Sequence, residues 1–169
     1  MFEIGEFIVH GTAGVCEVVQ IGPLTTFGVD KDKLYYTLSP CYSSGSKVFT
    51  PVDSTKVLMR PVISMEEAKN LINNLPDIEC LWIKEEKQRE NHYKESIKQC
   101  DCTEFVRIIK TIYLHKQTRL EQGKKVTAVD DKYFKMAEDR LYGELAIALG
   151  MNKDNVKEYI FDSIEKNKE

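Results

Sequence analysis

The 169-residue sequence has no long hydrophobic run. A helix needs roughly 18 consecutive apolar residues to span a bilayer, and no segment approaches that length. The opening residues, MFEIGEFIVHG, also lack the basic segment that precedes the apolar core of a secretory signal peptide. We therefore expect a cytoplasmic protein with no membrane partner.

Cysteine and histidine are sparse, with five Cys and three His. An odd number of scattered Cys favours reduced thiols over a disulfide framework. Cys100 and Cys102 lie close together, but no second thiol pair stands at zinc-ligand spacing, so no metal site is expected. His10, His92 and His115 lie in different predicted elements, and no hydrolase, nucleotide-binding or dinucleotide motif occurs. The sequence predicts no cofactor and no enzyme; a hydrolase or redox enzyme using His92 and Cys100 is a weak alternative.

An overall positive charge is also lacking, because 27 acidic residues face 24 basic ones and the net charge is −3. This excludes a uniformly basic surface for nucleic acid. Residues 83–125 are the exception, with eleven Lys or Arg against seven Asp or Glu. They provide either a local face for phosphates or a solvated helix surface on which Glu and Lys pair four residues apart. In the first case, DNA affinity is expected to be weak and to need a second partner.

The first third of the sequence has the pattern of short twisted strands. Val, Ile, Tyr, Phe and Thr are frequent, and turn residues such as Gly22-Pro23 separate the runs. Strands are predicted at Phe2, Ile4 and residues 7–9, then at 15–21, 34–38 and 47–50. Four or five such strands without intervening helices favour a small Tudor-like or SH3-like β-barrel over residues 1–60. Pro51 is expected to end the sheet, and residues 59–64 to form a hinge.

Residues 61–169 have helical periodicity, so the predicted fold class is α+β, with an all-α C-terminal domain of four or five helices. Ser64 and Glu67 form a capping box for a short helix to about Asn74, and Asp77 is a candidate cap for the next one. Either Asp101 or Thr103 can cap a helix to about residue 121. Two more helices are predicted, one from Thr127 to Gly150 and the last from about Lys153.

The stretch LWIKEEKQRENHYKESIKQ, residues 81–99, holds the single Trp and opens the basic block. In one continuous helix, Trp82, Arg89 and Tyr93 would share a stripe, with Trp82 and Arg89 about 10 Å apart. An aromatic ring beside a guanidinium suits docking on a charged polymer. It equally suits packing between two domains.

Four short motifs, in this order along the chain, resemble those of the CarD family of bacterial transcription regulators, also called CdnL. They are Phe7-Ile8-Val9-His10-Gly11 with Gly14, Val48-Phe49-Thr50-Pro51-Val52, Tyr93-Lys94, and Leu141-Tyr142-Gly143-Glu144-Leu145-Ala146. The resemblance implies an N-terminal Tudor-like domain that docks on the RNA polymerase β subunit. It also implies a helical domain that contacts promoter DNA at the upstream edge of the bubble and stabilises the open complex.

By position, the resemblance places the polymerase contact on Val48, Phe49 and Thr50. Some family members carry an Arg where Phe49 stands, so an aromatic contact is expected here in place of an ionic one. The chain is expected to act as a monomer. A protein–protein adaptor whose helical domain binds no DNA is the alternative.

The DNA contact implied by the resemblance falls on Lys94, which follows the helix Tyr. The family's Trp, which wedges into the minor groove, precedes that Tyr by four residues, and Arg89 stands there in this chain. Either Arg89 enters a narrow minor groove, or Trp82 reaches the DNA from seven residues earlier. Trp82 is also a candidate for packing at the interdomain surface.

Overall fold

The structure is a computed structural model that describes residues 1–81, 83 and 85–168. These residues form two compact units, Met1–Val62 and a second unit that begins at Ile63. The first unit contains the described strands and the second contains the described helices. The predicted α+β class, with a small β domain followed by helices, is confirmed.

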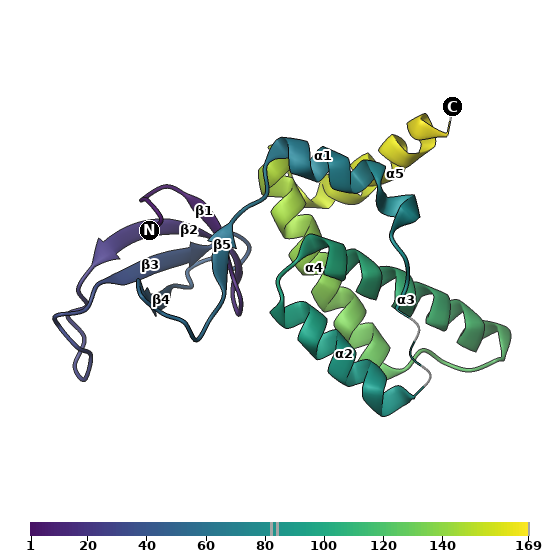
Figure 1. Cartoon of the computed structure of the whole chain (residues 1–169), viewed down its shortest axis with the longest axis horizontal. Coiled ribbons are helices and arrows are strands. Elements are labelled where there is room, and N and C mark those ends of the chain that lie inside the picture. Colours follow the sequence, from purple (N-terminus) through teal and green to yellow (C-terminus); the bar gives the residue numbers. More distant parts are fainter. Residues whose placement is uncertain (82, 84, 169) are drawn as a thin grey trace. The chain divides into compact units, whose positions relative to one another are not determined.

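The first unit is a five-stranded antiparallel sheet with the strand order β4-β3-β2-β1-β5 (Figure 1). Its strands are β1 (Phe7–His10), β2 (Gly14–Gly22), β3 (Tyr35–Pro40), β4 (Val48–Pro51) and β5 (Met59–Pro61). Their inward-facing residues form one apolar core of Ile8, Cys16, Val18, Tyr36 and Leu38. A bulge in β2 between Val18 and Gln20 shifts the register and increases the local bend of the sheet.

Strand β5 lies where the sequence predicted a hinge, so that prediction is wrong for Met59–Pro61. The strand pairs with β1, with Arg60 opposite Val9. A three-residue strand is too short to show alternation, and Pro61 argues against a strand in sequence. β5 is an edge strand, however, and an edge tolerates the missing N–H of proline.

The start of the chain also differs from the prediction, because β1 begins at Phe7 and excludes Phe2 and Ile4. Phe2 instead packs its ring 5.6 Å from that of Tyr36 and donates its backbone N–H to the Tyr36 hydroxyl at 3.0 Å. Tertiary contact with the core therefore replaces strand pairing at this end.

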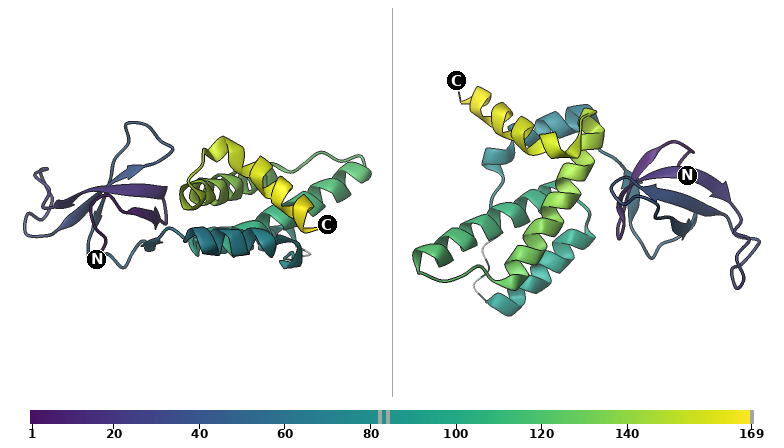
Figure 2. Two further views of the ribbon diagram at one scale, coloured as in Figure 1. Left: turned by 90° about the horizontal axis from the view of Figure 1, so that it is seen from above. Right: turned by 180° about the vertical axis from the view of Figure 1, so that it is seen from behind.

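In the second unit α2, α3 and α4 pack against one another, and α1 lies beside α5 (Figures 1 and 2). The helices are α1 (Met65–Asn73), α2 (Glu86–Lys98), α3 (Cys102–Glu121), α4 (Ala128–Leu149) and α5 (Val156–Asn167), with the 3-10 turns η1 (Leu75–Asp77) and η2 (Lys153–Asn155). Their shared core includes Phe105, Ile108, Ile112, Leu141 and Leu145. None of the described helices is long and apolar enough to cross a membrane.

The helix ends follow the predicted capping chemistry in most places. The Ser64 hydroxyl accepts from the N–H of Glu67 at 3.1 Å, and the Glu67 carboxylate accepts from the N–H of Ser64 at 2.7 Å. Of the two candidates for α3, Asp101 is the cap. Thr127 caps α4, and Gly150 ends it in the left-handed conformation, with φ of 66°.

The helix in this stretch, α2, begins only at Glu86, so the condition for a shared stripe of Trp82, Arg89 and Tyr93, one continuous helix through residues 81–99, is not met. The N–H of Leu81 donates to Thr111 Oγ1 at 2.8 Å, and Lys110 Nζ donates to the carbonyl of Ile78 at 2.8 Å. Side chains of α3 thus bind backbone N–H and C=O groups that would otherwise form hydrogen bonds within a helix. Asp77, expected to cap this helix, lies in η1.

Candidate functional site

Strand β4 is one outer edge of the sheet, and no described strand pairs with its far side. The N–H of Val52 donates to the carbonyl of Leu34 at 3.0 Å, which fixes the phase of the ladder between β3 and β4. Along an antiparallel strand, residues bonded to the neighbour alternate with residues whose N–H and C=O point away. Phe49 is therefore a residue with both groups on the free edge, and its side chain is 52% exposed.

The other two predicted polymerase contacts differ from Phe49 in orientation. Val48 packs against the sheet core, and Thr50 is buried. Beside Phe49 lies an open groove of about 590 Å³, lined in part by Lys33 and Lys56. Of the three predicted residues, Phe49 has an exposed side chain, whereas Val48 packs on the core and Thr50 is buried.

His10, from the first sequence motif, joins β1 to β4 inside the sheet unit. Its Nε2 lies 3.0 Å from Thr50 Oγ1, and its Nδ1 accepts from the N–H of Ala13 at 3.2 Å. Because a backbone N–H only donates, Nδ1 is the unprotonated nitrogen and Nε2 donates to Thr50. The motif therefore closes the curved sheet and holds β4 in place.

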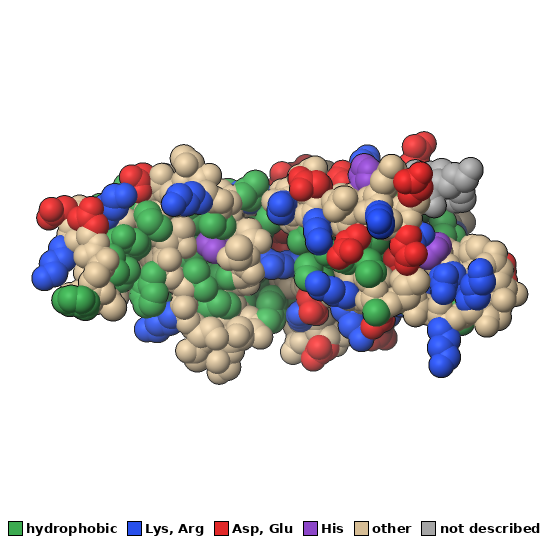
Figure 3. All heavy atoms as spheres, turned by 90° about the horizontal axis from the view of Figure 1, so that it is seen from below, with side chains coloured by type: hydrophobic (Ala, Val, Ile, Leu, Met, Phe, Trp, Pro, Cys, Tyr) green, Lys and Arg blue, Asp and Glu red, His purple; other side chains and the backbone are tan. Residues whose placement is uncertain are grey.

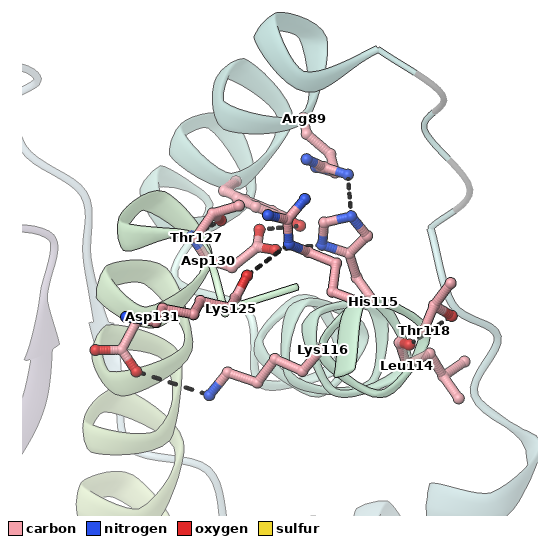
Figure 4. A network of polar contacts seen from close by, with 11 residues as sticks. Arg89, Leu114, His115, Lys116, Thr118, Lys125, Thr127, Asp130 and Asp131 are labelled. Atoms are coloured by element: carbon pink, nitrogen blue, oxygen red, sulfur yellow. Dashed lines mark hydrogen bonds and ion pairs between the residues drawn. The ribbon is translucent and has the colours of Figure 1, made fainter. Parts of the chain in front are cut away.

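Three helices of the second unit meet at a polar network (Figure 4). From α2, Arg89 Nη1 lies 2.9 Å from Nε2 of His115 on α3. His115 Nδ1 contacts Oδ2 of Asp130 on α4, and the Tyr93 hydroxyl donates to Asp130 Oδ1 at 3.3 Å. Asp130 is 1% exposed, so a buried carboxylate of α4 contacts both α2 and α3.

The network constrains Arg89, which was predicted to face DNA. One nitrogen of its guanidinium is held by His115, and the side chain is half-buried at a cavity of about 250 Å³. His115 and Asp130 follow Arg89 at large sequence separations and carry no motif, so sequence analysis missed them.

Tyr93 anchors α2 to the rest of the unit. Its ring is fully buried and lies 5.5 Å from that of Tyr133. Burial, and then the negative charge of Asp130, raise the pKa of Tyr93 well above its usual range. Lys94, the next residue on α2, is exposed.

Lys94 is the more accessible of the two described residues predicted to contact DNA. Its side chain is 51% exposed, and Nζ lies 3.5 Å from Glu90 Oε1. Such exposed i,i+4 pairs contribute only about 0.3–0.5 kcal/mol, so a phosphate can replace Glu90. Trp82, the third predicted contact, lies outside the described residues.

The surface charges of the helical unit are mixed. On the face shown in Figure 3, Lys and Arg side chains alternate with Asp and Glu and do not form one continuous patch. Exposed pairs such as Lys98 with Glu95 at 3.5 Å contribute to this pattern. The basic block of the sequence is therefore partly neutralised by its own acidic residues.

Glu144, from the last sequence motif, is also buried, at 1% exposure. Its Oε1 accepts from the N–H of Ile63 at 3.1 Å, and its Oε2 accepts from Cys102 Sγ at 3.1 Å. It thus joins α4 to the entry of the helical unit and to the start of α3. This motif has a structural role in the fold.

None of the five Cys residues, all of them within the described part of the chain, forms a disulfide. Cys16, Cys100 and Cys102 are buried. Within the described part of the chain, no three His, Cys, Asp or Glu side chains converge in a way that could hold a metal ion.

The two units match separate family profiles. Residues 2–63 match the profile described as CarD-like/TRCF RID domain, and residues 77–161 match CarD, C-terminal domain. A comparison with curated proteins gives no match. These are domains of RNA polymerase-interacting transcription factors, and the resemblance inferred from the motifs is confirmed. The chain belongs to the CarD family.

Proposed function

We propose that this protein docks on the RNA polymerase β subunit through the free edge of β4. The observation that carries the proposal is the outward N–H and C=O of Phe49 beside its half-exposed ring. An extended segment can add to such an edge by backbone hydrogen bonds, with side chains providing specificity. Full burial of a Phe ring contributes about 1.5–3 kcal/mol, so Phe49 is the main side-chain contact.

The helical unit would then contact promoter DNA at the upstream edge of the bubble. Lys94 supports this role because its ammonium is exposed on α2. Arg89 and Trp82 are the other proposed contacts, Arg89 after leaving His115. Phosphate contacts position a protein without reading sequence, and the mixed surface charge favours weak binding that polymerase docking reinforces.

The proposed mechanism is a shift in the equilibrium between closed and open promoter complexes. A protein that binds the melted state more tightly than the closed state stabilises it by the difference in binding free energy alone. No chemical step is required, so the protein would act as a non-enzymatic monomer. It would be cytoplasmic and associate with the nucleoid through RNA polymerase.

Polymerase docking is tested by the affinity for an isolated lobe of the β subunit from the same organism. Phe49→Ala should weaken binding about tenfold or more, as expected for an aromatic anchor. Phe27→Ala is the matched control, because Phe27 is fully exposed in the same unit. Equal affinities of the two variants, or no binding by the unaltered protein, would refute the docking site.

The internal bonding of Arg89 and Lys94 favours a second candidate, an adaptor whose helical unit binds no DNA. A forked promoter fragment separates the two functions. Salt-dependent binding that is reduced in Lys94→Ala or Arg89→Ala supports the transcription regulator. Binding that is absent, or unchanged in both variants, supports the adaptor.

A further inference from the structure

Arg89 has an internal partner and a proposed external one, and the bond to the internal partner holds its half-buried guanidinium at the network of His115 and Asp130. Its Nη1 lies 2.9 Å from His115 Nε2. The His115 side chain is 25% exposed, whereas that of Asp130 behind it is 1% exposed. His115 thus stands between a buried carboxylate and a cation near the surface.

The protonation state of His115 decides whether Arg89 can bind it. A guanidinium has only donors, so His115 Nε2 must accept and therefore carries no proton. Nδ1 then carries the proton and donates to Asp130. A second proton on Nε2 would place two N–H groups, and two positive charges, against each other. The bond to Arg89 would break, while the bond to Asp130 would become an ion pair.

The other groups around His115 do not replace Arg89 as the partner of His115 Nε2. Asp130 faces it from α4 and also accepts from Tyr93 of α2. The thiol of Cys80 shares the cavity beside Arg89 and His115. Lys116, next on α3, instead lies 3.7 Å from Asp131 on α4 (Figure 4). Among the described residues, Arg89 is thus the cation bonded to the imidazole.

We propose that His115 is a positioning residue for Arg89, and that proton uptake by its ring releases the guanidinium to a DNA phosphate. The inference rests on the DNA contact proposed above and adds its regulation by pH. Because the Asp130 bond is kept, α3 and α4 stay joined while Arg89 changes partner. A histidine ring takes up a proton as the pH falls, so acidification would strengthen DNA binding.

The test is the salt dependence of binding to a forked promoter fragment by the full chain, at about pH 8 and about pH 6. One additional phosphate contact should steepen the slope of log affinity against log salt by about 0.9 at the lower pH. His115→Gln keeps an acceptor and a donor but cannot titrate, so its slope should not change with pH. Arg89→Ala should also have one slope at both pH values.

His92→Gln is the matched control, because His92 is an exposed histidine on α2 and takes part in none of the contacts described for this network. It should retain the pH-dependent slope. A slope of the unaltered protein that does not change with pH, or a change that survives in Arg89→Ala, would overturn this inference alone. Absence of DNA binding at both pH values would overturn the proposed DNA contact as well.

Discussion

A single buried carboxylate joins three helices at Asp130. It accepts from Tyr93 of α2 and contacts His115 of α3, although its own position is in the first turn of α4. The residues that carry the resemblance include three similar cases, His10, Tyr93 and Glu144, each buried and hydrogen-bonded. At the scale of the residue, these buried motif residues hold helices and strands together. The proposed contact residues Phe49 and Lys94 are each next in sequence to a buried residue, Thr50 and Tyr93.

Asp130→Ala should lower the free energy of unfolding by about 3 kcal/mol, because it leaves His115 and Tyr93 without their shared acceptor. Urea denaturation measures the change. Asp131→Ala is the control, since Asp131 is 45% exposed and pairs with Lys135 at 2.9 Å. Asp131→Ala should lower the free energy of unfolding by less than about 0.5 kcal/mol. Equal losses of stability in Asp130→Ala and Asp131→Ala would contradict the stabilising role of the network around Asp130.

Tyr93→Phe should lower the free energy of unfolding by about 1 kcal/mol near neutral pH, through loss of the bond to Asp130. Burial holds the pKa of Tyr93 above its ordinary value of about 10. The stabilisation by Tyr93 is therefore fully present below pH 10 and decreases above it, where the unfolded chain loses the phenolic proton first. The stability difference between wild type and Tyr93→Phe should shrink above that pH; a constant difference would contradict it.

At the scale of the element, local chemistry decides where α3 begins. The Asp101 carboxylate accepts from the N–H groups of Thr103 at 2.7 Å and Glu104 at 3.4 Å. Thr103, the other candidate in the sequence, lies inside the first turn. Sequence alone offered two caps, and the structure uses the first.

Asp101→Ala should therefore lower the free energy of unfolding by about 1–2 kcal/mol, as expected for loss of an N-cap. Thr103→Ala should have a much smaller effect, because Thr103 is not the cap and Ala has the higher helix propensity. Thermal unfolding of the two variants checks this. A larger loss for Thr103→Ala would show that the cap was assigned to the wrong residue.

Elements with strong local signals were predictable, and those made by tertiary contacts were not. A high content of β-branched and aromatic residues between turn residues predicted β2 and β3, and apolar spacing with its caps predicted α4. The start of α2 depends on Thr111 and Lys110, whose bonds to the preceding segment span 30 and 32 residues. β5 is defined by its pairing with β1, which its three residues do not reveal.

At the scale of the whole molecule, the proposed contacts fall on different units, Phe49 on the sheet unit and Lys94 on the helical unit. Both residues are about half exposed, Phe49 at 52% and Lys94 at 51%. The bond of Arg89 to His115 was not predictable, because 26 residues separate them. Each unit alone has a modest binding surface, so we expect function to need both.

The lifetime of a promoter open complex, with and without the protein, is the most direct test of this account. A protein that docks on polymerase and binds the melted promoter more tightly should lengthen that lifetime. Phe49→Ala should remove most of the effect, whereas Phe27→Ala should retain it. An unchanged lifetime with the unaltered protein at saturating concentration would contradict the account.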